Sequence, residues 1–384
     1  MSPLQSPIDD LKELIAFPSV STTSNREISD WVAERLEALG FQVEQTRYSD
    51  HRNVEKVNVV GRRDPVTAAK DGPPGFAYFA HTDVVPADEW TGPGGDPFAP
   101  VVSEGRLYGR GSCDMKGSLA TMMSSAEQLS AVGQRGPLSI VCTADEEVGY
   151  VGAKHMVKHS AAYRDLVAAQ PICVIGEPTE LKVVHAHKGI VGMRITSHGR
   201  AAHSSTSDGV NANLAMVPML QTLLQINERT STVSDYLDQR FDPPTLSWNF
   251  GVSDHCSAIN VTPGRSVAWV SFRPMPKIDG NDLVELVQAR ADELGLDFER
   301  LDGGAPLWID PHSTCIRHFC ELAGGDPIRV CYGTDGGELT ELKNRVVIGP
   351  GSVAQAHTTD EWIELDQLSE GIELFTKAID RWCA

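Results

Sequence analysis

The sequence predicts an α/β protein of two domains, with the smaller domain inserted into the larger one. Its 384 residues exceed what one ordinary hydrophobic core holds, so two domains are expected. The first half alternates helix-like and strand-like segments, which is typical of an α/β domain. Residues 187–301 instead follow the order β-α-β-β-α-β, which is that of a ferredoxin-like unit. We therefore assign residues 1–186 and 302–384 to the large domain and 187–301 to the insertion.

The elements of the large domain follow from apolar periodicity. A helix is expected at Glu27–Leu39, where apolar residues recur at helical spacing and Gly40 provides a stop. Pro86–Pro100 is dense in proline and glycine and is expected to be a loop. A second helix is expected at Met115–Ala131. The strand-like runs are Phe41–Gln45, Val57–Val60, Phe76–Ala80, Leu138–Thr143, Ile172–Ile175 and, late in the chain, Val346–Ile348.

The inserted segment contains six expected elements. Its two helices are expected at Asn211–Asn227 and Asp282–Leu294. Its strands are expected at Ile190–Thr196, Thr245–Phe250, Val267–Phe272 and Leu296–Leu301.

Composition excludes some classes of partner. The chain is 41% hydrophobic and carries a net charge of −19, which argues against binding to nucleic acid or to an anionic membrane surface. No stretch has the length of a membrane span, and Met1–Glu13 lacks the pattern of a signal peptide. The eight cysteines form no C-x-x-C pair, which favours buried, reduced thiols and a cytoplasmic protein.

Potential metal ligands follow several of the strands. His81 ends an apolar run and Asp83 follows it, and an acid at that spacing can orient a metal-binding imidazole. Asp114 lies between glycines at the start of a helix, where its two oxygens can each meet a different ion. Each pattern alone also fits a surface histidine or a helix-capping aspartate.

Three further motifs complete the set. Glu146 and Glu147 close the strand that ends at Thr143, and like charges so close together require a neutralising cation. Glu177 ends the next strand, and His357 follows a glycine-rich turn. Exposed loop acids are the alternative for the Glu146 and Glu147 segment, and each of these motifs alone is a weak signal. Together, two imidazoles, three carboxylates and one spare acid are the donor set of a pair of zinc ions that hydrolyses an amide.

These motifs resemble those of a known family. The ordered set is His81-Thr-Asp83-Val-Val, Gly109-Arg-Gly111-Ser-Cys-Asp114-Met-Lys-Gly117, Thr143-Ala-Asp-Glu-Glu147-Val-Gly, Gly176-Glu177-Pro-Thr and His357. It is similar to that of the zinc metallopeptidases comprising aminoacylases, acetylornithine deacetylases and succinyl-diaminopimelate desuccinylases. The resemblance extends over nearly the whole chain and implies a di-zinc exopeptidase-like catalytic domain with an inserted ferredoxin-like dimerisation or lid domain.

The resemblance also implies a role for each of these residues. One zinc ion would be bound by His81, Asp114 and Glu177, and the other by Asp114, Glu147 and His357, with Co²⁺ or Mn²⁺ as substitutes. The resemblance implies that Asp83 would orient His81 and that Glu146 would be the general base and later the acid. It also implies a cis peptide bond between Asp114 and Met115.

The inserted domain carries further family motifs. His203 resembles the histidine that reaches across a homodimer interface to stabilise the oxyanion, which implies a homodimer formed through this domain. Asn260 and Arg273 resemble substrate-binding residues, and so does the turn that begins Gly333-Thr334.

Within the family, Ile175–Glu180 and His187–Gly189 are most similar to acetylornithine deacetylases, which act in arginine synthesis on a small N-acyl amino acid. Succinyl-diaminopimelate desuccinylase, and then a dipeptidase or general aminoacylase, are the alternatives. A catalytically silent binding protein would have lost ligands or the base, and all six residues are present. Serine-hydrolase and nucleotide-binding motifs such as G-x-S-x-G and G-x-x-x-x-G-K-[ST] do not occur.

Overall fold

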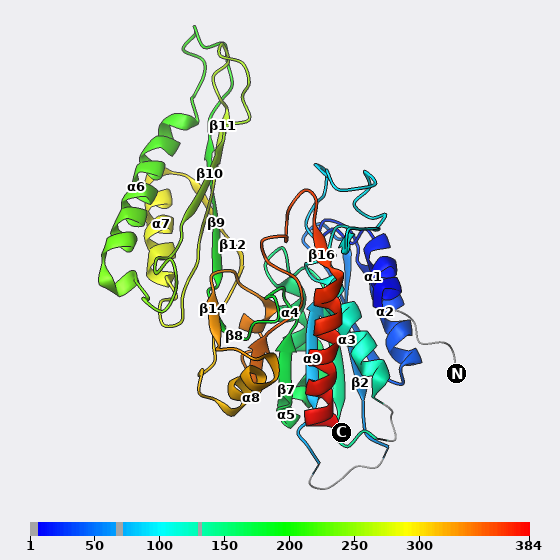
Figure 1. Cartoon of the computed structure of the whole chain (residues 1–384). Coiled ribbons are helices and arrows are strands. Elements are labelled where there is room, and N and C mark those ends of the chain that lie inside the picture. Colours follow the sequence, from blue (N-terminus) through cyan, green and yellow to red (C-terminus); the bar gives the residue numbers. More distant parts are fainter. Residues whose placement is uncertain (1–6, 67–71, 130–132) are drawn as a thin grey trace. The chain divides into compact units, whose positions relative to one another are not determined.

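A computed structural model describes residues 7–66, 72–129 and 133–384. The chain divides into two compact units (Figure 1). The first comprises the chain up to Ala186 together with Trp308–Ile328 and Thr334–Ala384, and the second comprises His187–Leu307 and Arg329–Gly333. The first segment of the second unit includes β12, whose last residue is Gly304. The sequence did not predict its second short segment.

A nine-stranded mixed sheet forms the centre of the first unit, in the order β1-β2-β6-β3-β7-β15-β8-β13 with β14 paired to β8. Its three central strands β6, β3 and β7 are parallel neighbours, and β15 continues parallel to β7. Fully apolar runs form the strands at the middle of this sheet, as expected for strands covered on both faces. The strands are β1 (Gln42–Ser49), β2 (Glu55–Arg63), β3 (Phe76–His81), β6 (Leu138–Thr143), β7 (Ile172–Ile175), β8 (Val184–His187), β13 (Leu307–Trp308), β14 (Ile328–Val330) and β15 (Arg345–Val347).

Helices cover both faces of this sheet. On one face, Tyr78 donates to or accepts from Ser118 of α3 at 2.6 Å, and Phe76 stacks on Trp382 of α9. Asn58 lies on the opposite face of β2 and donates to Gly152 O of α4 at 3.0 Å. The helices are α1 (Pro7–Ala16), α2 (Arg26–Ala38), α3 (Lys116–Gln128), α4 (Val151–His159), α5 (Ala161–Ala169), α8 (Thr314–Ala323) and α9 (Leu365–Cys383), with a 3-10 turn η2 at Asp335–Gly337.

The structure confirms the two helices expected here, with shifted ends. The first ends in Leu39 as its C-cap and Gly40 at φ 84°. The second begins at Lys116, and its expected end at Ala131 lies outside the described residues. The expected loop from Pro86 to Pro100 contains no helix or strand.

A separate three-stranded antiparallel sheet brings two distant segments together. It consists of β4 (Val101–Ser103), β5 (Arg106–Tyr108) and β16 (Trp362–Glu364). Trp362 pairs with Tyr108, so the residues before β16 lie beside those that follow β5. The sequence did not predict this sheet.

The second unit is the expected β-α-β-β-α-β fold. Its antiparallel sheet has the order β10-β11-β9-β12, and α6 and α7 lie together on one side of it (Figure 1). The elements are β9 (Ile190–His198), α6 (Asn213–Thr232), a 3-10 turn η1 (Ser234–Tyr236), β10 (Asn249–Ser253), β11 (Arg265–Phe272), α7 (Asn281–Leu294) and β12 (Asp297–Gly304).

The prediction of one strand in this unit is largely wrong. The strand predicted at Thr245–Phe250 begins only at Asn249. The reason is that the buried Lys188 ammonium takes up this stretch, donating to Pro243 O and Thr245 O at 2.7 Å and to Ser247 Oγ at 3.3 Å. The Thr245 carbonyl is therefore not available to a neighbouring strand, and Ser247 has a left-handed backbone at φ 49°, which a regular strand does not contain.

All eight cysteines are free thiols, and five of them are buried. Cys256, Cys320 and Cys331 are only partly covered, so burial was predicted correctly for most of them. None of the helices within residues 7–66, 72–129 and 133–384 combines the length and apolar character of a membrane span.

Candidate metal centre

The parallel strands of the large sheet place the expected ligands at one edge. His81 is the last residue of β3, Glu146 and Glu147 follow β6, and Glu177 follows β7. Because β6, β3 and β7 are parallel neighbours, their carboxyl ends open toward the same side. Residues that are distant in sequence therefore meet there.

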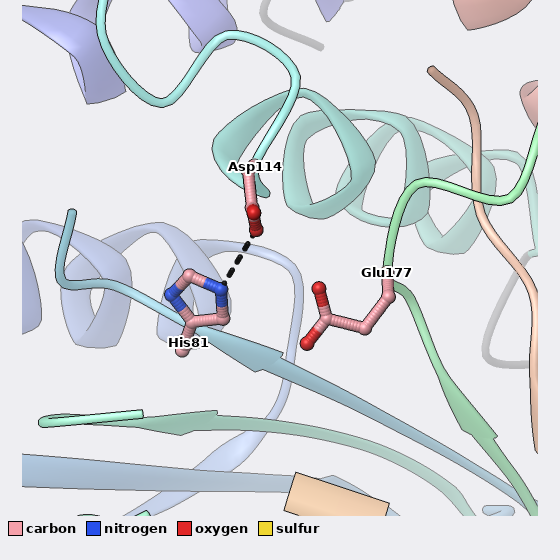
Figure 2. A group of neighbouring side chains, drawn as sticks. All are labelled: His81, Asp114 and Glu177. Atoms are coloured by element: carbon pink, nitrogen blue, oxygen red, sulfur yellow. Dashed lines mark hydrogen bonds and ion pairs between the residues drawn. The ribbon is translucent and has the colours of Figure 1, made fainter. Parts of the chain in front are cut away.

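His81, Asp114 and Glu177 form a first cluster (Figure 2), and one ligand atom of each lies within 4.8 Å of the others. His81 Nε2 is 3.1 Å from Asp114 Oδ1. Figure 2 shows the Glu177 carboxylate directed toward the other two side chains. Its Oε1 is buried and has no hydrogen-bond partner among the residues that the structure describes, although a buried carboxylate oxygen normally has one. A cation at this point would satisfy it.

Asp114, Glu147 and His357 form a second cluster of the same kind. His357 Nε2 lies 3.1 Å from the Glu147 carboxylate and 3.5 Å from Asp114 Oδ2. The two oxygens of Asp114 therefore face different imidazoles, Oδ1 toward His81 and Oδ2 toward His357. This is the arrangement that a carboxylate shared by two ions requires.

The hydrogen bond that orients His81 differs from the expected one. Nδ1 of His81 lies 2.9 Å from the backbone oxygen of Asp83, whereas the Asp83 carboxylate is 3.6 Å away. A carbonyl oxygen only accepts, so Nδ1 carries a proton and Nε2 is the ring atom that faces Asp114, where it donates to the carboxylate when protonated and can bind a metal ion when neutral. Asp83 Oδ1 instead accepts from Glu146 N at 3.1 Å and Oδ2 from Glu147 N at 3.3 Å. Asp83 thus fixes the backbone of the spare acid and of a ligand.

A buried ion pair supports the same loop from below. Asp145, at φ 54°, receives a hydrogen bond from Lys56 Nζ at 2.5 Å and one from Tyr48 Oη at 2.9 Å. Lys56 also donates to the carbonyls of Ser21 and Thr23, at 2.7 and 2.9 Å. Sequence reasoning assigned no role to Lys56 or Asp145.

The electrostatics of the cluster favour a cation. Burial, followed by the charge of neighbouring carboxylates, raises the pKa of Glu146 and of Glu177 well above the ordinary value. Burial and the charge of Asp114 raise the pKa of Glu147 as well. Burial would also raise the pKa of Asp114, but the hydrogen bond and charge of His81 and the charge of His357 bring it below its ordinary value. Acids with raised pKa values release their protons when a divalent ion binds, so the donor set fits metal.

Asp114 does not cap the helix that follows it. The helix α3 begins at Lys116, and its N-cap, Met115, makes no side-chain cap bond. The Asp114–Met115 peptide is cis, as the resemblance implies. The Asp114 carboxylate is consequently left for the two clusters.

The turn around Gly333 and Thr334 closes on itself. Thr334 is buried, and its Oγ1 accepts from Gly336 N at 3.0 Å while its carbonyl accepts from Gly337 N at 3.1 Å. Asp335, which sequence reasoning passed over, is buried and accepts from Thr143 Oγ1 at 2.5 Å. Its position next to a strand-end threonine could not be read from a glycine-rich motif.

The remaining predicted residues, His203, Asn260 and Arg273, belong to the second unit and not to the two clusters. His203 is exposed, and its Nδ1 lies 2.7 Å from Ser205 Oγ. Its loop runs beside that of Asn260, whose carbonyl accepts from Ser204 N at 3.0 Å. Arg273 follows β11 and is partly buried.

Comparison with known proteins gives a family match and several proteins of the same fold. The model of peptidase family M20/M25/M40 matches residues 77–381. An acetylornithine deacetylase of Myxococcus xanthus is 33% identical over 385 residues, covering 97% of this chain and 96% of that one. A di-peptidase of Saccharomyces cerevisiae has the same fold, with a TM-score of 0.78 at 17% identity, covering 98% of this chain and 95% of that one. A dinuclear metal binding peptidase of Bacillus subtilis superposes with a TM-score of 0.62 at 14% identity, covering 98% and 97%.

Proposed function

This chain belongs to peptidase family M20/M25/M40 and is a metal-dependent hydrolase of amide bonds, and within that class we propose that it deacetylates N-acetyl-L-ornithine, giving acetate and L-ornithine. The observation that carries the proposal is the shared carboxylate, since Asp114 presents one oxygen to each of two imidazoles. This arrangement is the one expected of a site for two metal ions.

Two zinc ions fit the donor set best. His81, Asp114 and Glu177 would bind one ion, and Asp114, Glu147 and His357 the other. Imidazole nitrogens and carboxylate oxygens are the ligands of catalytic zinc, and they also accept Co²⁺ or Mn²⁺. The bound ions would polarise the amide carbonyl and lower the pKa of water, which is the chemistry that amide hydrolysis at neutral pH needs.

Glu146 is the acid that this arrangement leaves free. It would take a proton from the attacking water and pass it to the leaving nitrogen. Burial raises its pKa, which makes the carboxylate a stronger proton acceptor. The Asp83 carboxylate holds its peptide N–H, so its backbone is fixed while the side chain exchanges the proton.

The choice of substrate rests on the relatives. A curated relative with 33% identity is named acetylornithine deacetylase, whereas the dipeptidase comparison, at 17% identity, reaches only the fold. The net charge of −19 favours a substrate with a cationic side chain. Succinyl-diaminopimelate desuccinylase and a general aminoacylase or dipeptidase use the same metal chemistry and are the alternatives. Arg273 and the Gly333-Thr334 turn would bind the substrate carboxylate, and Asn260 would lie near the substrate.

The second unit would form a homodimer and supply His203 to the partner's site. Its surface supports an interface, because α6 exposes Leu214, Val217 and Leu224 at 74%, 50% and 59%. The strand β10 also lies at an open edge of its sheet. A cytoplasmic location and a place in arginine synthesis follow from the proposed substrate, and the acidic surface argues against nucleic-acid or membrane partners.

Release of free amine from N-acetylornithine, N-succinyl-diaminopimelate, N-acetylcitrulline and N-acetylmethionine, compared side by side, tests the proposal. We expect the highest kcat/KM for N-acetylornithine, and loss of all activity with a chelator. A higher kcat/KM for another member of the panel would show that this compound, and not N-acetylornithine, is the substrate. Activity that persists with the chelator would refute the metal site.

A further inference from the structure

Glu361 is a buried acid that has no role in the proposed reaction. It immediately precedes β16, and the pairing of Trp362 with Tyr108 places it beside the segment that follows β5. Its own carbonyl accepts from Gly109 N at 3.0 Å. The register of the small sheet therefore fixes Glu361 against the loop that leads to Asp114.

Both oxygens of the Glu361 carboxylate accept hydrogen bonds from that loop. Oε1 accepts from the backbone N–H of Cys113 at 2.8 Å and of Asp114 at 2.9 Å. Oε2 accepts from Gly111 N at 2.9 Å and from Arg110 Nη1 at 2.7 Å. The side chain is 1% exposed, so water does not compete for these bonds. Charge-assisted bonds of this kind are about twice as strong as neutral ones.

Arg110 extends this support to the other side of the site. Its Nη2 donates to Thr358 O at 3.0 Å and to Pro86 O at 3.2 Å. Thr358 directly follows His357, which has a left-handed backbone at φ 62°. A planar guanidinium reaches an acid and two carbonyls at once, which a lysine ammonium on a single stem does not reproduce. Arg110 thus connects the loop of Asp114 to the loop of His357.

We propose that Glu361 and Arg110 are positioning residues that hold Asp114 and His357 at the spacing a second metal ion requires. The inference rests on the proposed di-metal function and goes beyond it by assigning the control of second-ion affinity to a pair that touches neither ion. Glu361 positions Asp114 by accepting from the Asp114 backbone N–H, and Arg110 positions His357 by donating to the carbonyl of the next residue, Thr358.

The two ions should depend on this pair unequally. In the first cluster, His81 is held by Asp83 O, and the residue before Glu177 donates its N–H to Phe79 O at 3.0 Å, so both are fixed by the large sheet. In the second cluster, Asp114 and His357 are both attached to the Glu361–Arg110 pair. Loss of Arg110 should therefore weaken the second ion selectively, and loss of Glu361 should weaken both, because Asp114 is shared.

Stepwise metal binding tests this directly. Metal-free wild type, Glu361→Gln, Arg110→Lys and a control, Glu364→Gln, are titrated with Zn²⁺ by calorimetry and with Co²⁺ by its visible absorption. Glu364 is the matched control because it is an acid three residues later, at the end of β16, half-exposed and 3.6 Å from Arg106. We expect Arg110→Lys to weaken the second ion by about 10- to 100-fold with the first unchanged, and Glu361→Gln to weaken both by a similar factor. The control should match wild type.

Wild-type stepwise affinities in both variants would overturn the proposal, as would an equal loss for both ions in Arg110→Lys. Circular dichroism of the metal-free proteins shows whether each variant is folded. If Glu361→Gln does not fold, Arg110→Lys alone decides, since it keeps the charge but does not reach Glu361, Thr358 and Pro86 together. These titrations contain no substrate, so their result does not depend on which substrate the panel identifies. If the metal affinities are unchanged, the proposal is refuted even when the protein hydrolyses N-acetylornithine at the normal rate.

Discussion

Replacing Glu146 by glutamine separates proton transfer from metal binding. Glutamine has nearly the same shape, and the backbone N–H of this residue stays bonded to Asp83 Oδ1 at 3.1 Å. The amide cannot take up a proton from water at neutral pH. The two metal clusters do not include Glu146, so both should keep their geometry in the variant.

The size of the effect follows from the role proposed for Glu146. A positioned general base and acid contributes about 10²- to 10⁴-fold to a rate. At about 1.4 kcal/mol for each tenfold change, this corresponds to about 3 to 5 kcal/mol of transition-state stabilisation. The loss should appear in kcat with KM nearly unchanged, because no contact with the bound substrate is removed.

The assay is steady-state hydrolysis of N-acetylornithine, or of the best substrate of the panel, alongside metal content by elemental analysis. We expect two ions per chain and a kcat reduced at least 100-fold. Glu180→Gln, an exposed acid paired with Lys182, serves as the charge-loss control and should keep full activity. An unchanged rate in Glu146→Gln would refute its role as base, and loss of metal would show that it is a ligand instead.

Three further outcomes are expected. Lys56→Met should lower the free energy of unfolding by about 3 to 5 kcal/mol in urea titrations, because it leaves the buried Asp145 carboxylate without its cation. A loss below about 1 kcal/mol would contradict this, and so would a double variant with Asp145→Asn that recovers no stability. His203→Ala should lower kcat with metal retained, and mixing it with Glu146→Gln subunits should restore activity; mixed dimers that stay inactive would exclude action across the interface. Burial raises the pKa of Asp335 from 3.8 to about 7, so the folded metal-free protein keeps a proton that the unfolded chain releases, and its stability should fall as pH rises through that range. The urea midpoint measured across these pH values should fall less steeply in Asp335→Asn, and an equal slope in both proteins would contradict the prediction.

Local sequence was sufficient for the parts of the fold that local pattern controls. Leu138–Thr143 and Ile172–Ile175 were predicted with the bounds the structure gives, because buried parallel strands are short continuous apolar runs bounded by breakers. The ligands after them could be predicted for the same reason, since parallel strands must end at one edge. The order of the inserted elements likewise follows from alternating periodicity.

What the sequence could not give depends on long-range pairing. Glu361 meets the N–H of Gly111 across 250 positions of sequence, and only the pairing of β16 with β5 creates that contact. The strand expected at Thr245 failed for a similar reason, since an ammonium 57 positions away takes its carbonyl. Asp83 was found by its spacing, yet its carboxylate holds the Glu146 backbone and not the ring of His81. Spacing indicates which residues meet, and the register of the sheet decides which atoms do.

Anomalous diffraction from crystals grown with zinc, measured at the zinc absorption edge, tests the shared carboxylate most directly. Two peaks about 3.5 to 4 Å apart are expected, one beside His81 and one beside His357, with Asp114 between them. A single peak that does not involve Asp114, or none at either cluster, would contradict a di-metal centre in this protein.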